Sequence, residues 1–166
     1  MKILLISDTH GRTEVLSALL QKHGAEIGML CHTGDGCRDI ARYESRFPHI
    51  KMIAVAGNSD YSALSELEYL ITLETPVKTL RVFMTHGHMY GVKRNLDSLR
   101  YAALEKKADA CFFGHTHNPV VFEQDGILFM NPGSLGFPHE YNVHTYGLAE
   151  VTGEGKIIGN LCEYHT

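Results

Sequence analysis

The sequence contains no tryptophan, only five prolines and no long hydrophobic run among its 166 residues. The first hydrophobic run, residues 3–6, is far too short for the apolar segment of a signal peptide or for a membrane span. Asp8 closes this run, and no other stretch approaches the required length. We therefore expect a cytoplasmic protein that makes no membrane contact.

Clustered cysteines and an excess of basic residues are also missing. The four cysteines form no C-x-x-C pair, so a zinc site built from cysteines is not indicated and we expect reduced thiols. The 15 basic residues are outnumbered by 19 acidic residues, which gives a net charge of −4. No basic field is available to hold a nucleic-acid backbone, so the sequence predicts no nucleic-acid-binding surface.

The composition is that of an ordinary globular domain, with one unusual feature. Hydrophobic residues make up 44% and charged residues 20% of the chain, which is enough apolar surface to form a core. The length suits a single domain over residues 1–166, without a linker or an internal repeat. The unusual feature is the presence of eleven histidines. Histidine is the commonest metal ligand and titrates near neutral pH, so the positions of these residues are informative.

The hydrophobic pattern of the first third predicts alternating strands and helices. Nearly continuous hydrophobic runs at 2–7, 28–33 and 52–56 predict strands that are buried on both faces. Helical spacing of hydrophobic residues predicts helices at 13–22 and 38–47. This alternation indicates a parallel sheet with right-handed crossover connections.

The later part of the chain has a different pattern. It predicts a hairpin at 68–85, a helix at 96–106 and a strand at 110–113. Glycine-containing turns separate four further predicted strands, which are residues 120–123, 127–130, 145–151 and 156–162. Two packed sheets with helices outside accommodate both halves of the chain. The predicted fold class is therefore α/β (α+β).

Five predicted strands end in short polar segments that contain glycine. In open α/β sheets the ligand crevice lies outside the carboxyl ends of the strands, so we expect these segments to meet at one edge. The adjacent glycines let the backbone turn sharply there. The side chains that these segments bring to the edge are Asp8, His10, Asp35, Asn58, His86, His115 and His117.

These seven side chains offer a mixed set of oxygen and nitrogen ligands. Such a set suits borderline divalent ions, such as manganese, iron, zinc, cobalt and nickel, better than calcium. Seven ligands are too many for one tetrahedral ion and about right for two ions. The spacing in Asp-x-His and His-x-His places both members of each pair on one face of the segment. Two ions that share a carboxylate can clamp a phosphate and generate a hydroxide between them.

Each motif by itself has an ordinary structural explanation. An Asp-Thr-His segment is more often a turn or a helix cap than a ligand pair, and Gly-Asp and Gly-Asn are common in turns. The Asn-Pro-Gly-Ser segment at 131–134 is likewise typical of a tight turn. The joint occurrence of five polar clusters at strand ends, without any histidine-rich tract, nevertheless favours a metal site.

These residues, in this order, resemble the signature of the calcineurin-like metallophosphoesterase superfamily. The matching motifs are Asp-x-His, Gly-Asp, Gly-Asn, a single His and Gly-His-x-His, and they span residues 8–117. The Asn-Pro-Gly-Ser segment is similar to that of the small YfcE-type phosphodiesterase branch, which includes the retromer subunit Vps29. The resemblance implies a four-layer αββα sandwich of two mixed β-sheets flanked by helices, which agrees with the strand pattern.

The resemblance also implies the ligands of two divalent metal ions. The first ion would be bound by Asp8, His10, Asp35 and His117. The second ion would be bound by Asp35, Asn58, His86 and His115, with Asp35 as the bridging ligand. We expect manganese, and nickel, cobalt, iron and zinc are the alternatives.

The implied reaction is the hydrolysis of a small phosphodiester, with a metal-bridging hydroxide as the nucleophile. Asn58 would also act on the substrate, because its amide can steer a phosphate oxygen. A metal-dependent phosphomonoesterase or nucleotidase is an alternative, since pocket shape separates these classes and the sequence does not show it. A non-catalytic, Vps29-like scaffold for protein interactions is a second alternative. Relatives are often oligomers, so a homo-oligomer is also expected.

One position departs from the family pattern. Larger relatives have a histidine after the Gly-Asn pair as the candidate general acid, small relatives usually have cysteine, and this chain has Ser59. A serine hydroxyl is too weak an acid to protonate the leaving group at neutral pH. Water or another histidine would then supply the proton, and His88 is the nearest candidate in the sequence. Arg12 is a candidate for gripping a phosphate, although a surface arginine explains it equally well.

Overall fold

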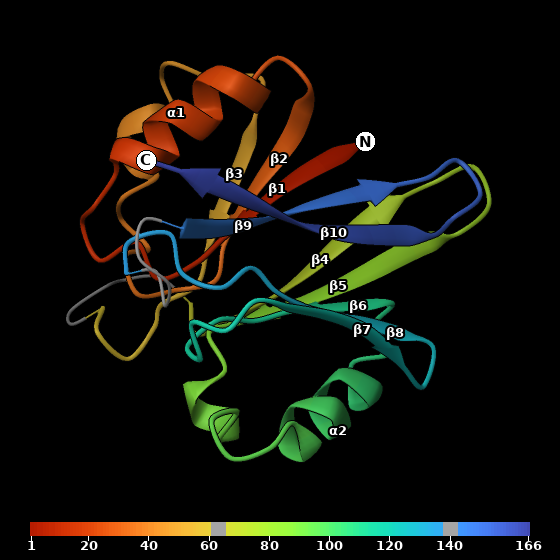
Figure 1. Ribbon diagram of the computed structural model, residues 1–166. Helices are drawn as coiled ribbons and strands as arrows, with labels where there is room; N and C mark the ends of the chain where they lie inside the picture. The colour runs from red at the N-terminus through yellow and green to blue at the C-terminus, as the bar shows by residue number, and fades with distance from the viewer. Residues whose placement is uncertain (61–65, 138–142) are drawn as a thin grey trace.

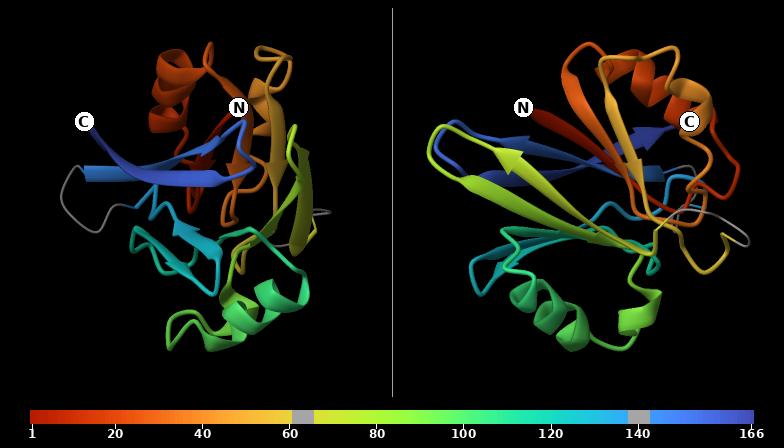
Figure 2. Two further views of the ribbon diagram at one scale, coloured as in Figure 1. Left: turned by 90° about the vertical axis from the view of Figure 1, so that its right-hand side faces the viewer. Right: turned by 180° about the vertical axis from the view of Figure 1, so that it is seen from behind.

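Two five-stranded sheets pack against each other in the computed structural model, which describes residues 1–60, 66–137 and 143–166. Within these residues one α-helix covers the outer face of each sheet (Figures 1 and 2). Hydrophobic residues from both sheets form a single buried cluster between them. The predicted αββα sandwich is therefore confirmed.

The first sheet has the strand order β10-β9-β1-β2-β3. Strands β1, β2 and β3 pair in parallel, and β9 pairs antiparallel with both β1 and β10. The bounds are Lys2–Ile6 for β1, Ile27–His32 for β2, Lys51–Ala54 for β3, Val143–Val151 for β9 and Ile157–His165 for β10.

Helix α1 (Glu14–His23) covers this first sheet. One face of this helix is buried, and its buried residues are Val15, Leu16, Leu19 and Leu20. They pack in one cluster with Leu4 and Ile6 of β1, whereas Ile3 and Leu5 belong to the core between the sheets. Strand β1 is thus buried on both faces, which explains its continuous hydrophobic run.

The second sheet has the strand order β4-β5-β6-β8-β7. Strands β5, β6 and β8 are parallel, and β4 and β7 pair antiparallel at the two edges. The bounds are Glu68–Glu74 for β4, Thr79–Thr85 for β5, Ala110–Phe112 for β6, Val120–Gln124 for β7 and Ile127–Asn131 for β8. Helix α2 (Asp97–Glu105) covers this sheet and packs Leu99 and Ala103 against Phe83 and Phe129.

The helix predicted at 38–47 is wrong, because only the 3₁₀ turn η1 (Ala41–Tyr43) occurs there. The segment begins with a sharp turn at Gly36, where φ is 126°. The backbone N–H groups of Gly36 and Cys37 both donate to the carboxylate of Asp60 in the neighbouring loop. These bonds tie the segment to that loop, so it forms successive short turns in place of an α-helix.

The other predicted helices and strands are confirmed, with bounds displaced by at most a few residues. A second 3₁₀ turn, η2 (His88–Tyr90), follows β5 and was not predicted. In the described part of the chain, no helix combines the length and the hydrophobicity that crossing a bilayer requires.

The carboxyl ends of β1, β2, β3, β5 and β6 lie at one edge of the sandwich, on the left in Figure 1. Backbone hydrogen bonds join the loops there. The N–H of Asp8 donates to the carbonyl of Gly34 at 2.9 Å, and the N–H of Gly114 donates to the carbonyl of His86 at 3.1 Å. The fold therefore brings together the polar segments that the sequence places at strand ends.

Candidate metal centre

The loops after these strands have an unusual backbone conformation. Positive φ angles, which non-glycine residues rarely adopt, occur at five of the seven predicted ligands. These five are Asp8 (53°), His10 (46°), Asp35 (55°), His115 (68°) and His117 (59°). Aspartate and histidine tolerate this region better than most residues do. Backbone strain of this kind is concentrated at functional sites.

Asp8, His10 and His117 form the first cluster of potential metal ligands. One ligand atom from each lies within 4.8 Å of the others. The Nε2 atom of His117 is 3.0 Å from Oδ1 of Asp8. The second oxygen of Asp8 accepts hydrogen bonds from the Ser7 hydroxyl and from the N–H of His115. The carboxylate is thus held from behind while its first oxygen faces the histidines.

Asp35, Asn58, His86 and His115 form the second cluster. The Nε2 atom of His86 lies 3.2 Å from Oδ1 of Asn58 and 3.2 Å from Nδ1 of His115. Oδ2 of Asp35 lies 3.5 Å from Nε2 of His86 and 3.7 Å from Nε2 of His10 in the first cluster. Asp35 therefore approaches both clusters, as a bridging ligand must, and Asp8 also offers an oxygen within 4.8 Å of ligand atoms of Asp35 and His86.

The surroundings of His86 determine which of its ring nitrogens is protonated. Its Nδ1 is 2.7 Å from the carbonyl oxygen of Thr33, which can only accept, so Nδ1 holds the proton. In the neutral ring Nε2 is then an acceptor, and it faces the acceptor oxygens of Asp35 and Asn58. Acceptors that face one another are stabilised by a cation between them. This set of atoms fits a divalent metal ion.

The surroundings of Asp8 and His115 favour their metal-binding forms. Burial, together with the electrostatic interaction with His86, lowers the pKa of His115 to about 4, so this ring is neutral at pH 7. Burial alone would raise the pKa of Asp8, but hydrogen bonds from His117 and Ser7 and the electrostatic interaction with His86 outweigh it and lower the pKa. Neutral imidazole and ionised carboxylate are the forms that bind metals.

Ser59 holds the carboxylate of Asp35 through two hydrogen bonds. Its backbone N–H donates to Oδ1 at 2.8 Å, and its hydroxyl donates to Oδ2 at 3.0 Å. Sequence reasoning treated Ser59 only as a poor substitute for a general acid and missed this contact. Because the hydroxyl proton is already donated to Asp35, Ser59 orients the carboxylate that lies between the clusters.

We expect Ser59→Ala to weaken metal binding. Loss of a hydrogen-bonding partner behind a metal ligand typically costs about 10- to 100-fold in affinity. Ser59→Thr keeps a hydroxyl and serves as the matched control, with an affinity near that of the wild type. Calorimetric titration with manganese measures both variants. Wild-type affinity in Ser59→Ala would show that the hydroxyl does not support Asp35.

A buried histidine outside the predicted ligands supports the first ligand loop. Nδ1 of His32 accepts a hydrogen bond from the N–H of Gly34 at 3.1 Å, so Nε2 holds the proton. Nε2 donates to the hydroxyl of Thr9 at 2.9 Å, and that hydroxyl donates to Asp39 at 2.6 Å. This chain of bonds ties β2 to the loop after β1. The only sequence signal for it is a histidine at the end of a buried strand.

We expect His32 to make the free energy of unfolding depend on pH. Burial lowers the pKa of His32 from 6.5 to about 4. Between these two pH values the unfolded state binds more protons than the folded state. The stabilising contribution of His32 to the free energy of unfolding is therefore complete above pH 6.5 and is lost as the pH falls toward 4. For this one group the loss from about pH 7.5 to about pH 5 is on the order of 2 kcal/mol.

Denaturant unfolding in the presence of a chelator measures this dependence without a contribution from bound metal. His32→Gln should lose about 2 kcal/mol less on acidification than the wild type does. His165→Gln replaces an exposed histidine and should behave as the wild type. An unchanged pH dependence in His32→Gln would refute the contribution of this residue.

The Asn-Pro-Gly-Ser segment does more than form a tight turn. The amide of Asn131 donates to the carbonyl of Gly114 at 3.0 Å, and its oxygen accepts from the N–H of Gly133 at 2.9 Å. The hydroxyl of Ser134 donates to the carbonyl of Asp8 at 3.0 Å. Both polar side chains are buried. The segment therefore fixes the loops that contain Asp8 and the His-x-His pair.

His88 flanks the second cluster. Its ring centroid lies 5.4 Å from that of His86 and 6.1 Å from that of His115. Its Nδ1 is buried and, in the described residues, has no hydrogen-bond partner. The structure thus places His88 beside two members of the second cluster, and its catalytic role stays a prediction.

Arg12 lies beside the first cluster, next to an exposed aromatic residue. Its guanidinium group donates to the carbonyl oxygen of Gly136 at 3.3 Å and lies 4.0 Å from the centre of the Phe137 ring. The Phe137 ring in turn lies 5.1 Å from the ring of His10. Phosphate binding by Arg12 stays a prediction.

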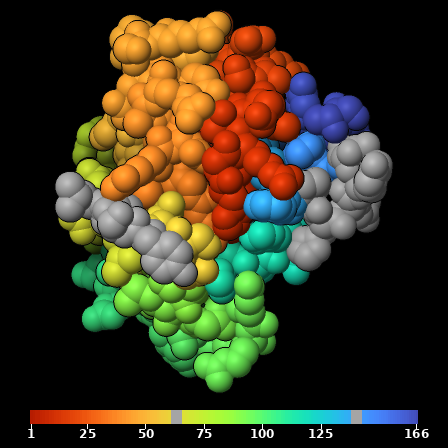
Figure 3. Space-filling model, turned by 90° about the vertical axis from the view of Figure 1, so that its left-hand side faces the viewer, coloured from red at the N-terminus to blue at the C-terminus, as the bar shows by residue number. Residues whose placement is uncertain are grey.

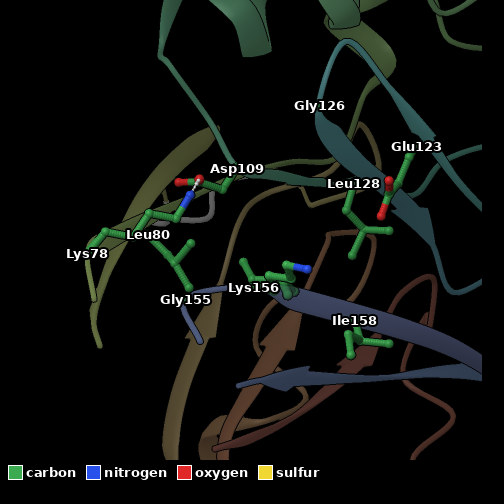
Figure 4. A pocket seen from close by; sticks show the side chains of 10 residues that line it. Lys78, Leu80, Asp109, Glu123, Gly126, Leu128, Gly155, Lys156 and Ile158 are labelled. Atoms are coloured by element: carbon green, nitrogen blue, oxygen red, sulfur yellow. Dashed lines mark hydrogen bonds and ion pairs between the residues drawn. The ribbon is translucent and has the colours of Figure 1, made fainter. Parts of the chain in front are cut away.

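Of two depressions in the surface, one lies next to these clusters and the other lies far from them. One of about 420 Å³ adjoins the ligands and is lined by His10, Gly11, Asp35, Gly36, Arg38, Asp39, Ser59 and Asp60. Another of about 280 Å³ lies at the opposite ends of the strands, where Lys78 forms an ion pair with Asp109 (Figure 4). No predicted ligand lines the second depression. Of these two depressions, only the first adjoins predicted ligands.

The family model described as the calcineurin-like phosphoesterase superfamily domain matches residues 1–154. The chain therefore belongs to the calcineurin-like phosphoesterase superfamily, as its motifs predict. The class that this match and the fold define is a metal-dependent phosphoesterase.

Individual relatives agree with this assignment. The chain is 31% identical to "Probable metallophosphoesterase YsnB" of Bacillus subtilis, over 95% of this chain and 89% of that protein. It is also 31% identical to "Phosphodiesterase YfcE" of Escherichia coli, over 90% of this chain and 88% of that protein. A crystal structure of a predicted phosphoesterase from Streptococcus pneumoniae has the same fold, with a TM-score of 0.76 at 23% identity over 98% and 97% of the two chains.

Proposed function

We propose that this chain is a phosphodiesterase with two divalent metal ions, most simply manganese. The main support is the convergence of acceptor atoms around Nε2 of His86 and Oδ2 of Asp35, which a cation would stabilise. The name of the Escherichia coli relative, a phosphodiesterase, supports diesters as the substrate class. A cytoplasmic location and self-association are part of the same proposal.

The two clusters would hold one ion each. The first ion would be bound by Asp8, His10, Asp35 and His117, and the second by Asp35, Asn58, His86 and His115. When bound, two such ions polarise the phosphoryl oxygens and activate a water molecule for attack on phosphorus. Ser59, Ser7 and the carbonyl of Thr33 hold ligands in place. Positioned groups of this kind lose little entropy when the substrate binds.

The leaving group would receive little help from Ser59, because this hydroxyl donates its proton to Asp35. His88, which flanks the second cluster, is the residue that we propose to act on the leaving group. Asn58 is exposed, and its amide can steer a phosphate oxygen while its carbonyl faces His86. Diesters with good leaving groups, such as aryl esters, should therefore turn over faster than alkyl diesters.

Turnover of bis(p-nitrophenyl) phosphate by chelator-stripped protein tests the proposal. Manganese is added back first, followed by nickel, cobalt, iron and zinc, with p-nitrophenyl phosphate measured alongside. We expect metal to restore activity and the diester to be preferred. Preference for the monoester would instead assign a phosphomonoesterase or nucleotidase. A folded protein without turnover in any metal would instead favour a protein-interaction scaffold.

A further inference from the structure

Phe137 is a large aromatic residue that is exposed directly beside the first metal cluster. It is 42% exposed, and its ring meets the ring of His10 edge to face, with centroids 5.1 Å apart. We infer that Phe137 and Arg12 form a subsite for a planar aromatic substituent on the phosphodiester, such as an aryl group or a nucleobase. This inference rests on the proposed function and names the substrate class of the same site.

The backbone fixes where Phe137 stands relative to the metal ligands. The N–H of Gly136 donates to the carbonyl of Asp8 at 3.0 Å, and the N–H of Phe137 donates to the hydroxyl of Ser134 at 2.9 Å. A Cβ atom at Gly136 would lie only 2.2 Å from the carbonyl oxygen of Thr9, so this close approach requires glycine. The main chain at Phe137 is therefore fixed relative to the loop that contains Asp8.

The surface view agrees with this arrangement. In Figure 3 the segment that follows β1, drawn in red, lies against the light-blue segment that precedes residue 138. The two segments meet on the face to which the carboxyl ends of the strands point. Because the ring of Phe137 lies 5.1 Å from that of His10, a substrate bound at these ligands would have Phe137 as a neighbour.

Arg12 gives the subsite a positive charge. Its guanidinium carbon lies 4.0 Å from the centre of the Phe137 ring, which is the geometry of a cation–π contact. The same group donates to the carbonyl of Gly136, which limits its movement. A cation attracts the anionic diester, and an aromatic ring selects a planar substituent through stacking or edge-to-face contact. Together these two groups favour an aromatic phosphodiester over an aliphatic one.

An exposed aromatic side chain is not by itself evidence of binding, and Tyr101 on α2 provides the comparison. Tyr101 is 64% exposed and has a guanidinium group, that of Arg100, 5.3 Å from its ring centre. In the described part of the chain Tyr101 makes no ring contact with a predicted ligand, whereas Phe137 contacts the ring of His10. Tyr101 and Arg100 thus form a matched aromatic–arginine pair without a neighbouring cluster of predicted ligands.

Binding of methyl phenylphosphonate and methyl methylphosphonate to the manganese-loaded protein tests the inference, because each carries a single negative charge and two substituents, as a phosphodiester does. Their phosphorus–carbon bond is not hydrolysed and methoxide is a poor leaving group, so calorimetry reports affinity. We expect the wild type to bind methyl phenylphosphonate about fivefold or more tightly than methyl methylphosphonate. Phe137→Ala should reduce this ratio to about 1, whereas Tyr101→Ala should leave it unchanged. If Phe137→Ala does not fold, Phe137→Leu replaces it in the test. This variant keeps an apolar side chain without an aromatic ring and should also lower the ratio.

The outcomes separate this inference from the proposed function. Equal affinities of the wild type for both probes, or an unchanged ratio in the Phe137 variants, would overturn the aromatic subsite and leave the phosphodiesterase proposal intact. Absence of binding of either probe, in a protein that binds manganese, would count against phosphoryl binding at this centre and would overturn both. An unchanged metal affinity in Phe137→Ala is expected in every case.

Discussion

Asp35→Asn is expected to remove both metal ions and to lower diester turnover by at least about 10³-fold. This loss is larger than the 10- to 100-fold loss of affinity that typically follows removal of a supporting hydrogen bond, because Asp35 itself lies between the clusters. Its Oδ2 is 3.5 Å from Nε2 of His86 and 3.7 Å from Nε2 of His10. Asparagine has the same shape but no negative charge, so the fold should persist while the shared anionic ligand is lost.

Metal content after dialysis, measured by atomic emission, and turnover of bis(p-nitrophenyl) phosphate together check this prediction. Asp97→Asn is the matched control, since Asp97 is exposed in the first turn of α2, away from the ligand loops. The control should keep wild-type metal content and turnover. Two tightly bound ions and ordinary turnover in Asp35→Asn would show that this carboxylate is not the bridge.

Gly57→Ala is expected to weaken metal binding almost as much as Asp35→Asn does, although residue 57 contains no predicted ligand atom. A Cβ atom there would lie 2.1 Å from Oδ1 and 2.4 Å from the backbone N of Asp35. The backbone nitrogen cannot move aside cheaply, so the carboxylate would have to leave its place between the clusters. We expect metal affinity to fall by about 100-fold or more, and stability to fall by about 1–3 kcal/mol from overpacking.

Gly153→Ala separates this effect from the general cost of adding a methyl group. No atom lies within 4 Å of a Cβ built at Gly153, so that variant should retain wild-type metal affinity and stability. Calorimetric titration with manganese and denaturant unfolding measure both quantities. If Gly57→Ala bound manganese as the wild type does, the close contact would not control the position of Asp35.

The spacing of hydrophobic residues predicts the helices and strands of the fold, because it shows which face of each element is buried. The spacing of Leu16, Leu19 and Leu20 predicts α1 because a helix must cover the sheet with one face. The site was predictable for a related reason. Parallel strands end at a common edge, so the candidate ligands after β1, β2 and β3 had to converge there.

The features that could not be predicted depend on contacts between distant parts of the chain. Ser59 and Asp35 are 24 positions apart, and their hydrogen bonds appear only once β2 and β3 are paired. Thr9 and Asp39 are 30 positions apart and are joined in the same way. The false helix at 38–47 has the same origin, because the loop contacts made by Gly36 and Cys37 override a helical pattern.

The central claim is that two divalent ions, shared by Asp35, are needed for hydrolysis of phosphodiesters. The most direct measurement is a manganese titration of chelator-stripped protein in which bound manganese and turnover of bis(p-nitrophenyl) phosphate are followed together. The account predicts that turnover rises mainly as the second ion binds and reaches its maximum at two ions per chain. Maximal turnover with one ion bound, or with none, would contradict it.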